Sequence, residues 1–77
     1  MSNAKDELRD ARRALGELAV SVSMMADKLT AAHAAMASRN IARATELQRK
    51  ASDYVDEMQG YLAIARDAQR ALEKVAA

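Results

Sequence analysis

Few side chains of this sequence have the type and spacing that catalysis requires, and the single histidine, His33, is the first to consider. A nucleophilic serine or cysteine needs a base within hydrogen-bond reach and a third group that orients this base. The 77-residue chain has no cysteine, and its serines are scattered along segments with helical periodicity. We therefore predict no catalytic residue. We interpret His33 as a surface residue near a turn, with pH-sensitive association as its alternative role.

The acidic side chains are the second group to consider, because carboxylates bind metal ions. Bundles that hold two metal ions use a Glu-x-x-His motif, but the residue three positions before His33 is Thr30. Asp53, Asp56 and Glu57 cluster without the glycine turn that a helix-loop-helix calcium site needs. We interpret this cluster as a solvated helix face. We predict no metal, no cofactor and no small-molecule substrate.

The basic residues are the third group, since arginine and lysine neutralise phosphates. Arg9, Arg12 and Arg13 are the candidate contacts to nucleic acid. Acidic residues are interleaved with them at spacings that favour ion pairs along a helix. The formal net charge is +1 and the chain has two tyrosines as its aromatic residues, whereas nucleic-acid binding favours a larger positive excess and rings that stack on bases. An RNA- or DNA-binding four-helix bundle is therefore the alternative function.

Helices must position these groups, because apolar residues recur every seven residues along most of the chain. Two such series in one segment form the a/d pattern of a helix that packs on other helices. The series before residue 40 are Leu8, Leu15, Val22, Leu29 and Met36, and Ala4, Ala11, Leu18, Met25 and Ala32. The series after it are Ala44, Ala51, Met58, Ala65 and Leu72, and Leu47, Tyr54, Tyr61, Ala68 and Val75.

The two patterns are out of phase, so a single continued helix would place charged residues on its apolar stripe. The segment 37–40 lies at the break. Asn tolerates the left-handed conformation that ends helices, and Ser or Asn can also cap the helix that follows. We predict one domain, 1–77, with a helix over 4–37, a turn at 38–40 and a helix over 41–76, and with Ser2 or Asn3 as the first cap. One continuous helix is the alternative.

Folding the chain about residues 39 and 40 brings apolar side chains level with one another. Large residues then meet small or flexible ones, as a close-packed layer requires. The predicted pairs are Met25 with Tyr54, Val22 with Met58, Leu18 with Tyr61, Leu15 with Ala65, Ala11 with Ala68, and Leu8 with Leu72. The predicted fold class is all-α, an antiparallel hairpin of two long amphipathic helices.

A two-helix hairpin buries less surface than a compact domain of the same length, so we expect it to associate. The flanks of the first stripe are small (Ala14, Ala19, Ser21, Ala26 and Ala35), and Ile41, Val55, Leu62 and Ile64 widen the second. Two copies forming a four-helix bundle would bury this surface. The predicted self-association core consists of Leu8, Leu15, Leu18, Val22, Met25, Leu29, Met36, Leu47, Tyr54, Met58, Tyr61 and Leu72.

Val20 and Met24 extend the apolar surface of the first helix beyond this core. They are four residues apart and therefore neighbours on a helix, which makes them the candidate patch for another protein. The leading function is a non-catalytic protein-interaction module, an adaptor, chaperone or inhibitor that acts as a homodimeric helical bundle. A purely structural oligomerisation element is a further alternative.

The chain has no secretion-signal pattern and no apolar run near the roughly 18 residues of a membrane span, so we predict a cytoplasmic protein without a membrane partner. Its alanine- and arginine-rich composition is typical of a GC-rich bacterium or its phage. In helix number and length it is similar to small bacterial hairpin proteins, among them RNA binders of the Rop kind and co-chaperones of type III secretion needle subunits. Such likeness of fold does not transfer function.

Overall fold

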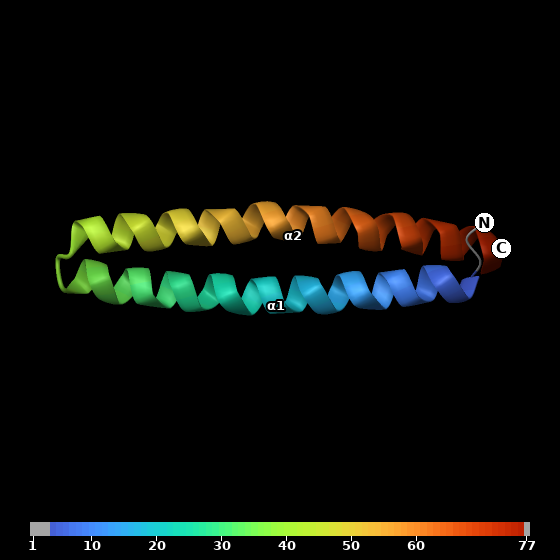
Figure 1. Cartoon of the computed structure of the whole chain (residues 1–77), viewed down its shortest axis with the longest axis horizontal. Helices are drawn as coiled ribbons and strands as arrows, with labels where there is room; N and C mark the ends of the chain where they lie inside the picture. Colours follow the sequence, from blue (N-terminus) through green and yellow to red (C-terminus); the bar gives the residue numbers. More distant parts are fainter. Residues whose placement is uncertain (1–3, 77) are drawn as a thin grey trace.

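The protein is a hairpin of two long antiparallel helices (Figure 1). The computed structural model describes residues 4–76, with α1 spanning Ala4–Ala37 and α2 spanning Ile41–Ala76. The helices lie side by side in a rod 55 Å long and 18 Å wide, and the start of α1 meets the end of α2. The predicted helical hairpin is therefore confirmed, and the single continuous helix is excluded. The predicted caps Ser2 and Asn3 lie outside the described residues.

The turn ends α1 with a left-handed residue. Arg39 has a φ of 59°, and its N–H donates to the carbonyl oxygen of Met36 at 2.9 Å. The N–H of Asn40 donates to the carbonyl oxygen of Ala35 at 2.8 Å. These two bonds form a Schellman motif, which satisfies carbonyl groups at the end of a helix. The left-handed residue is thus Arg39, although the residue type had favoured Asn for this conformation.

Asn40 instead begins α2. Its side-chain Oδ1 accepts a hydrogen bond from the N–H of Arg43 at 3.3 Å, and its carbonyl oxygen accepts one from the N–H of Ala44 at 3.1 Å. This is the geometry of an N-cap, in which a short polar side chain pairs a free N–H of the first helical turn. Adjacent residues therefore end one helix and start the next, which is why a short turn suffices.

The left-handed Arg39 offers the first test of this turn. A residue with a Cβ atom pays about 1 to 2 kcal/mol in this conformation, whereas glycine adopts it freely. We expect Arg39→Gly to raise the free energy of unfolding by about 1 kcal/mol, measured by urea denaturation at fixed protein concentration. Arg49→Gly, the same exchange inside α2, should lower it by up to about 1 kcal/mol. Equal signs for the two variants would contradict the assigned turn.

Contact between the helices follows one line of side chains on each, here called the seam. Its members recur at alternating steps of three and four residues, the repeat of a coiled-coil interface. On α1 the seam comprises buried Ala14, Ser21, Ala32 and Ala35 with partly buried Ala11, Leu18, Met25 and Lys28. On α2 it comprises buried Ala44, Leu47, Ala51, Ala65 and Ala68 with partly buried Tyr54, Met58, Tyr61 and Leu72.

Small side chains dominate the seam. Near the turn, Ala32 and Ala35 of α1 cluster with Ala44 and Leu47 of α2, and Ala44 is the most buried of them at 1% exposure. Because the separation of packed helices depends on the side chains at their contact, alanines allow a close approach of the two backbones. Leu47, 6% exposed, is the large side chain within this cluster.

Three of the predicted facing pairs are wrong by one residue on α1. Leu8, Leu15 and Val22 were expected to face α2, but they are 52%, 52% and 45% exposed. The residues that precede Leu15 and Val22, Ala14 and Ser21, are buried in their place. The hairpin buries the small flank of α1 because this brings the backbones together. The larger flank is left at the surface.

Gly16 and Gly60 do not explain this close approach. A Cβ atom built on either residue meets no heavy atom within 4 Å, and neither residue has a positive φ. Alanine would therefore fit at both positions, and it is favoured in a helix interior by about 0.5 to 1 kcal/mol. The hairpin itself does not require these glycines.

Candidate functional site

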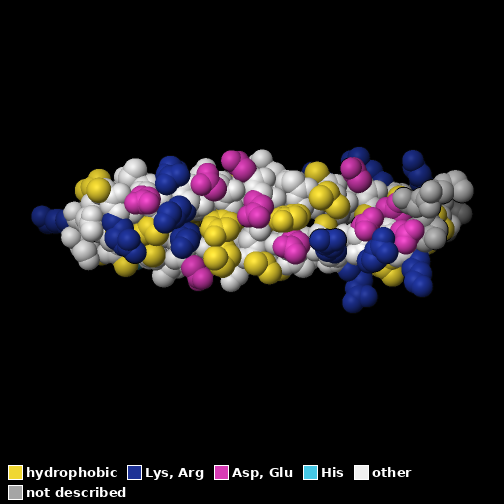
Figure 2. Space-filling model, viewed as in Figure 1, with side chains coloured by type: hydrophobic (Ala, Val, Ile, Leu, Met, Phe, Trp, Pro, Cys, Tyr) yellow, Lys and Arg dark blue, Asp and Glu magenta, His cyan; other side chains and the backbone are white. Residues whose placement is uncertain are grey.

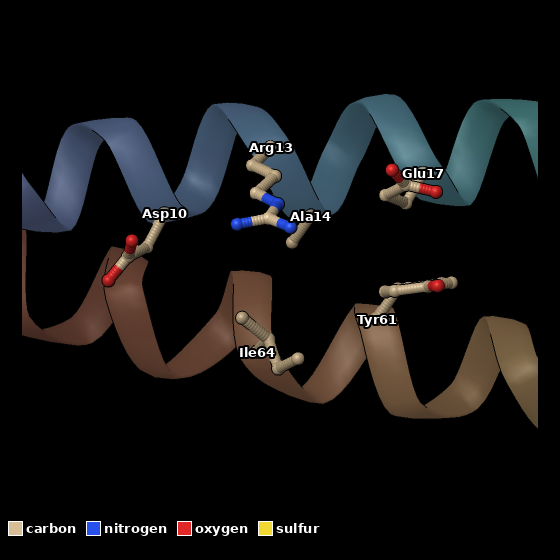
Figure 3. Close-up of a pocket in the computed structure, with 6 residues that line it drawn as sticks. All are labelled: Asp10, Arg13, Ala14, Glu17, Tyr61 and Ile64. Carbon is tan, nitrogen blue, oxygen red and sulfur yellow. The ribbon is translucent and has the colours of Figure 1, made fainter.

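The seam divides the rod into two broad faces, and one of them carries charges from both helices. A shallow depression on it is lined by Asp10, Arg13, Ala14 and Glu17 of α1 and by Tyr61 and Ile64 of α2 (Figure 3). In Figure 3, Arg13 points from α1 toward α2, while Ile64 points from α2 toward α1. We call this side the charged face.

Two further depressions follow the same side of the seam toward the turn. One joins Lys28 of α1 to Lys50 and Asp53 of α2, and the other joins Ala31 to Arg43. Residues separated by multiples of seven lie on one flank of a coiled-coil helix. Ala31 thus shares the flank of Asp10 and Glu17, and Arg43 and Lys50 share the flank of Ile64. The charged face therefore runs the length of the hairpin.

Charged side chains occupy much of the surface that Figure 2 shows. Lysine and arginine side chains gather toward the two ends of the rod, and acidic side chains lie among and between them. Several form ion pairs within one helix, such as Lys50 with Glu46 at 3.8 Å and Arg70 with Asp67 at 3.9 Å. Such exposed pairs contribute little to stability, about 0 to 1 kcal/mol each. They do indicate a surface that is exposed to solvent.

The remaining flanks of the two helices share the opposite side, which we call the apolar face. Its large side chains are Leu8, Leu15, Val22, Leu29 and Met36 of α1, with Ile41, Val55 and Leu62 of α2. The five on α1 are between 45% and 52% exposed. They recur every seven residues, so they form one continuous stripe over about 42 Å of helix at 1.5 Å per residue. Within residues 4–76, no comparable stripe lies on the charged face.

The apolar face lacks charged side chains over most of its length. On the outer side of the α1 stripe, Ala19 and Ala26 are small, and exposed His33 lies at the edge toward the turn. Between Ile41 and Leu62, the corresponding flank of α2 carries only Thr45, Gln48, Ser52, Val55 and Gln59. Depletion of charged residues is what distinguishes the centre of a protein interface from other surface. A contiguous apolar patch of this length is unusual on a monomer.

The twelve predicted core residues therefore separate into two groups. Seven lie in the seam: Leu18, Met25, Leu47, Tyr54, Met58, Tyr61 and Leu72. Five lie on the apolar face: Leu8, Leu15, Val22, Leu29 and Met36. Sequence reasoning treated Ala14, Ser21 and Ala35 as mere flanks, although they are buried in the seam. Their own spacing by multiples of seven residues was the signal that could have identified them.

The predicted partner patch lies away from the apolar face. Met24 is 38% exposed and shares the flank of Asp10 and Glu17, which places it on the charged face. Val20, 59% exposed, lies beside it on the outer side of α1. Both residues are accessible to another protein, but they are two side chains against eight on the opposite face.

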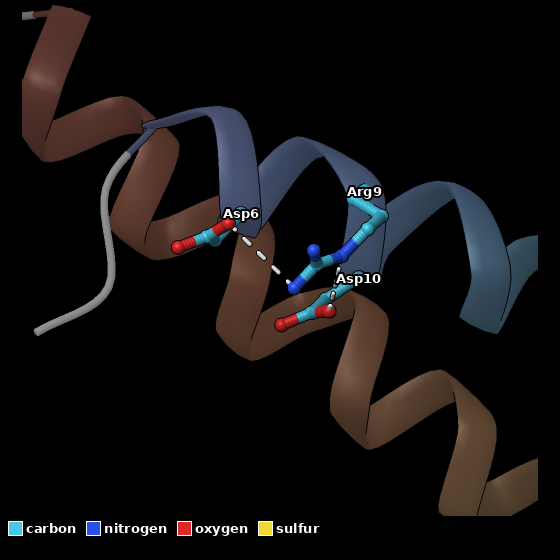
Figure 4. Close-up of polar contacts among 3 residues, drawn as sticks. All are labelled: Asp6, Arg9 and Asp10. Atoms are coloured by element: carbon cyan, nitrogen blue, oxygen red, sulfur yellow. Dashed lines mark ion pairs between the residues drawn. The ribbon is translucent and has the colours of Figure 1, made fainter.

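The candidate nucleic-acid contacts do come together. Arg9, Arg12 and Arg13 line a shallow depression with Lys5 on the outer surface of α1, near its start. However, Arg9 forms ion pairs with Asp6 at 3.6 Å and Asp10 at 3.7 Å (Figure 4). These carboxylates offset part of the positive charge that would attract a phosphate.

Within residues 4–76, no three His, Asp or Glu side chains lie close enough together to hold a metal ion. Neither of the described helices contains a stretch long and apolar enough to cross a membrane. No protein-family model, curated protein or solved structure matches the chain. The exposed surface of the hairpin is therefore the feature that bears on function.

Proposed function

We propose that the protein is a non-catalytic protein-interaction module, a small adaptor, chaperone or inhibitor, which acts as a homo-oligomeric helical bundle in the cytoplasm. The observation that supports this proposal is the apolar face, which lacks charged side chains over most of its length and exposes eight large side chains of both helices. Covering a fully exposed side chain of this kind is worth about 1.5 to 3 kcal/mol, and these side chains, at 37% to 56% exposure, would each gain part of that. A partner that covers the stripe would thus gain from many residues at once.

The charged face would remain in water when the apolar face is covered. Val20 and Met24 would then stay exposed on the outside of the bundle. They remain the proposed contact to a different protein, since two neighbouring apolar residues among charges can anchor a partner helix. Association through one face and recognition through the other would suit an adaptor or inhibitor, because the recognition residues stay accessible in the assembled bundle.

Paired charge substitutions on the two faces test this division. We expect Leu15→Glu with Leu29→Glu to weaken self-association at least about 100-fold, because the interface would have to bury unpaired carboxylates. Light scattering coupled to size-exclusion chromatography should then give the 8.4 kDa monomer mass at a protein concentration at which the wild type is associated. The matched control, Val20→Glu with Met24→Glu, should retain the wild-type mass.

The outcomes separate the competing functions. If both double variants associate like the wild type, the apolar face is not the interface. If the wild type is a monomer at all concentrations, the bundle proposal is wrong. Binding of a labelled RNA hairpin or DNA duplex that falls steeply with salt would instead favour the nucleic-acid alternative, for which the depression around Arg12 and Arg13 is the supporting observation.

A further inference from the structure

The stripe on α1 is spaced symmetrically about Val22, so it can pair with a reversed copy of itself. Leu15 and Leu29 lie seven residues to either side of Val22, and Leu8 and Met36 lie fourteen residues to either side. The stripe has the same spacing in either direction, and its residue types differ only at the ends, where Leu8 corresponds to Met36. It is therefore complementary to an antiparallel copy of itself centred on Val22.

Building on the proposed self-association, we propose that α1 packs antiparallel on α1 of a second copy, with Val22 on the two-fold axis. A two-fold dimer uses the same patch on both subunits, so each contact occurs twice. In this arrangement Leu15 lies opposite Leu29 of the second copy, and Leu8 lies opposite its Met36. Every large side chain of the stripe meets another large side chain.

The surroundings of Val22 suit such a contact. Ala19 and Ala26, which lie three residues before it and four residues after it, are small and uncharged. Because side-chain size sets the distance between packed helices, they permit the two α1 helices to approach closely. The neighbouring flank of α2 adds Val55 and Leu62 together with uncharged polar residues, so α2 can cover α2 of the second copy. No charged side chain would be buried at the centre.

The apolar face is large enough for a dimer interface. The rod is 55 Å long and 18 Å wide, so one broad face offers a footprint of about 1,000 Å². A standard interface takes about 800 Å² from each partner. A second hairpin of the same length would therefore cover enough surface for a stable dimer.

The other two-fold arrangement fits less well. It would place α1 over α2 of the second copy, with both turns at the same end. The register of the hairpin then puts Leu8 and Leu29 opposite glutamines, Gln69 and Gln48. It also brings Arg12 next to Arg66 of the second copy, because these residues lie at the same level of the rod. The antiparallel arrangement keeps Arg12 and Arg66 of the two copies apart. It moves the glutamine contacts from α1 to α2, where Gln48 and Gln69 lie level with Leu62 and Ile41 of the second copy.

Disulfide cross-linking in this cysteine-free chain tests the axis directly. Two cysteines join when their Cβ atoms approach to about 4 Å, which a residue on the axis can do with its own copy. Under mild oxidation, we expect Val22→Cys to form a disulfide-linked dimer at least about tenfold faster than Val20→Cys, which faces away. Non-reducing gel electrophoresis measures both rates.

A mixing experiment adds a second reading that does not depend on Val22. Leu15→Cys and Leu29→Cys should each cross-link slowly alone but rapidly when mixed, since each faces the other across the axis. Cross-linking of the mixture no faster than of either variant alone would overturn the antiparallel arrangement. If the wild-type mass is still that of a dimer, the proposed interaction module is retained, but its two copies pack in a different arrangement. A monomeric wild type would contradict both the proposed self-association and the antiparallel arrangement.

Discussion

Replacing Leu47 with alanine is expected to lower the free energy of unfolding by about 2 to 4 kcal/mol. Leu47 is the large side chain of the buried cluster near the turn and is only 6% exposed. Removing it leaves a gap against Ala32, Ala35 and Ala44, which are too small to fill it. The loss combines the burial of the side chain with the cost of the cavity, and Leu-to-Ala exchanges in cores span about 2 to 5 kcal/mol.

Val75→Ala is the matched control for this prediction. Val75 also lies on α2 and is apolar, but it is 65% exposed, so we expect its loss to change stability by less than about 0.5 kcal/mol. Chemical denaturation at one protein concentration, followed by circular dichroism, gives both values. Similar effects for the two variants would show that the cluster of alanines around Leu47 does not hold the hairpin closed.

The position of the turn could be predicted because apolar periodicity reports directly on which residues share a helix face. The series that ends at Met36 and the series that begins at Ala44 cannot lie on one straight stripe. The chain must therefore reverse between them, and the structure places the turn between Ala37 and Ile41. A phase break of this kind depends on local spacing alone, so no knowledge of tertiary contacts was needed.

Sequence reasoning could not decide which side of the apolar stripe of α1 would face α2. Leu15 and its equivalents recur every seven residues, and so do Ala14 and its equivalents, one position earlier. Apolar periodicity favours the line of Leu15, because the line of Ala14 includes Ser21 and Lys28. The choice depends on how closely the backbones can approach, and alanines on both helices favour the smaller line. The larger side chains were predicted to pack between the two helices, but the smaller side chains occupy that position.

The left-handed residue was the second point that residue types could not decide. Asn is favoured over Arg for this conformation, yet Arg39 adopts it. The reason is that Asn40 is needed one position later, where its side chain caps α2. When two adjacent positions both suit one Asn, the cap and the left-handed site compete. Propensity alone does not rank them.

The exposed stripe leads to the second large prediction, that folding depends on protein concentration. If a second copy covers Val22 and its neighbours, the dimer and not the single hairpin is the stable unit. Stability then follows mass action, and a 100-fold rise in concentration should add about 2.7 kcal/mol per dimer. For a chain of this length we expect the midpoint of thermal unfolding to rise by about 10 °C over that range.

Two variants make this result specific to the apolar face. Leu15→Glu with Leu29→Glu should have a lower midpoint that no longer depends on concentration, because its hairpin folds alone or not at all. Gly16→Ala, which lies off the apolar face and has open space around its Cβ, should raise the midpoint and keep the concentration dependence. A wild-type midpoint that is equal at about 5 and 500 μM would mean that the seam alone holds the hairpin. The stripe on α1 would then have to be covered by a different protein.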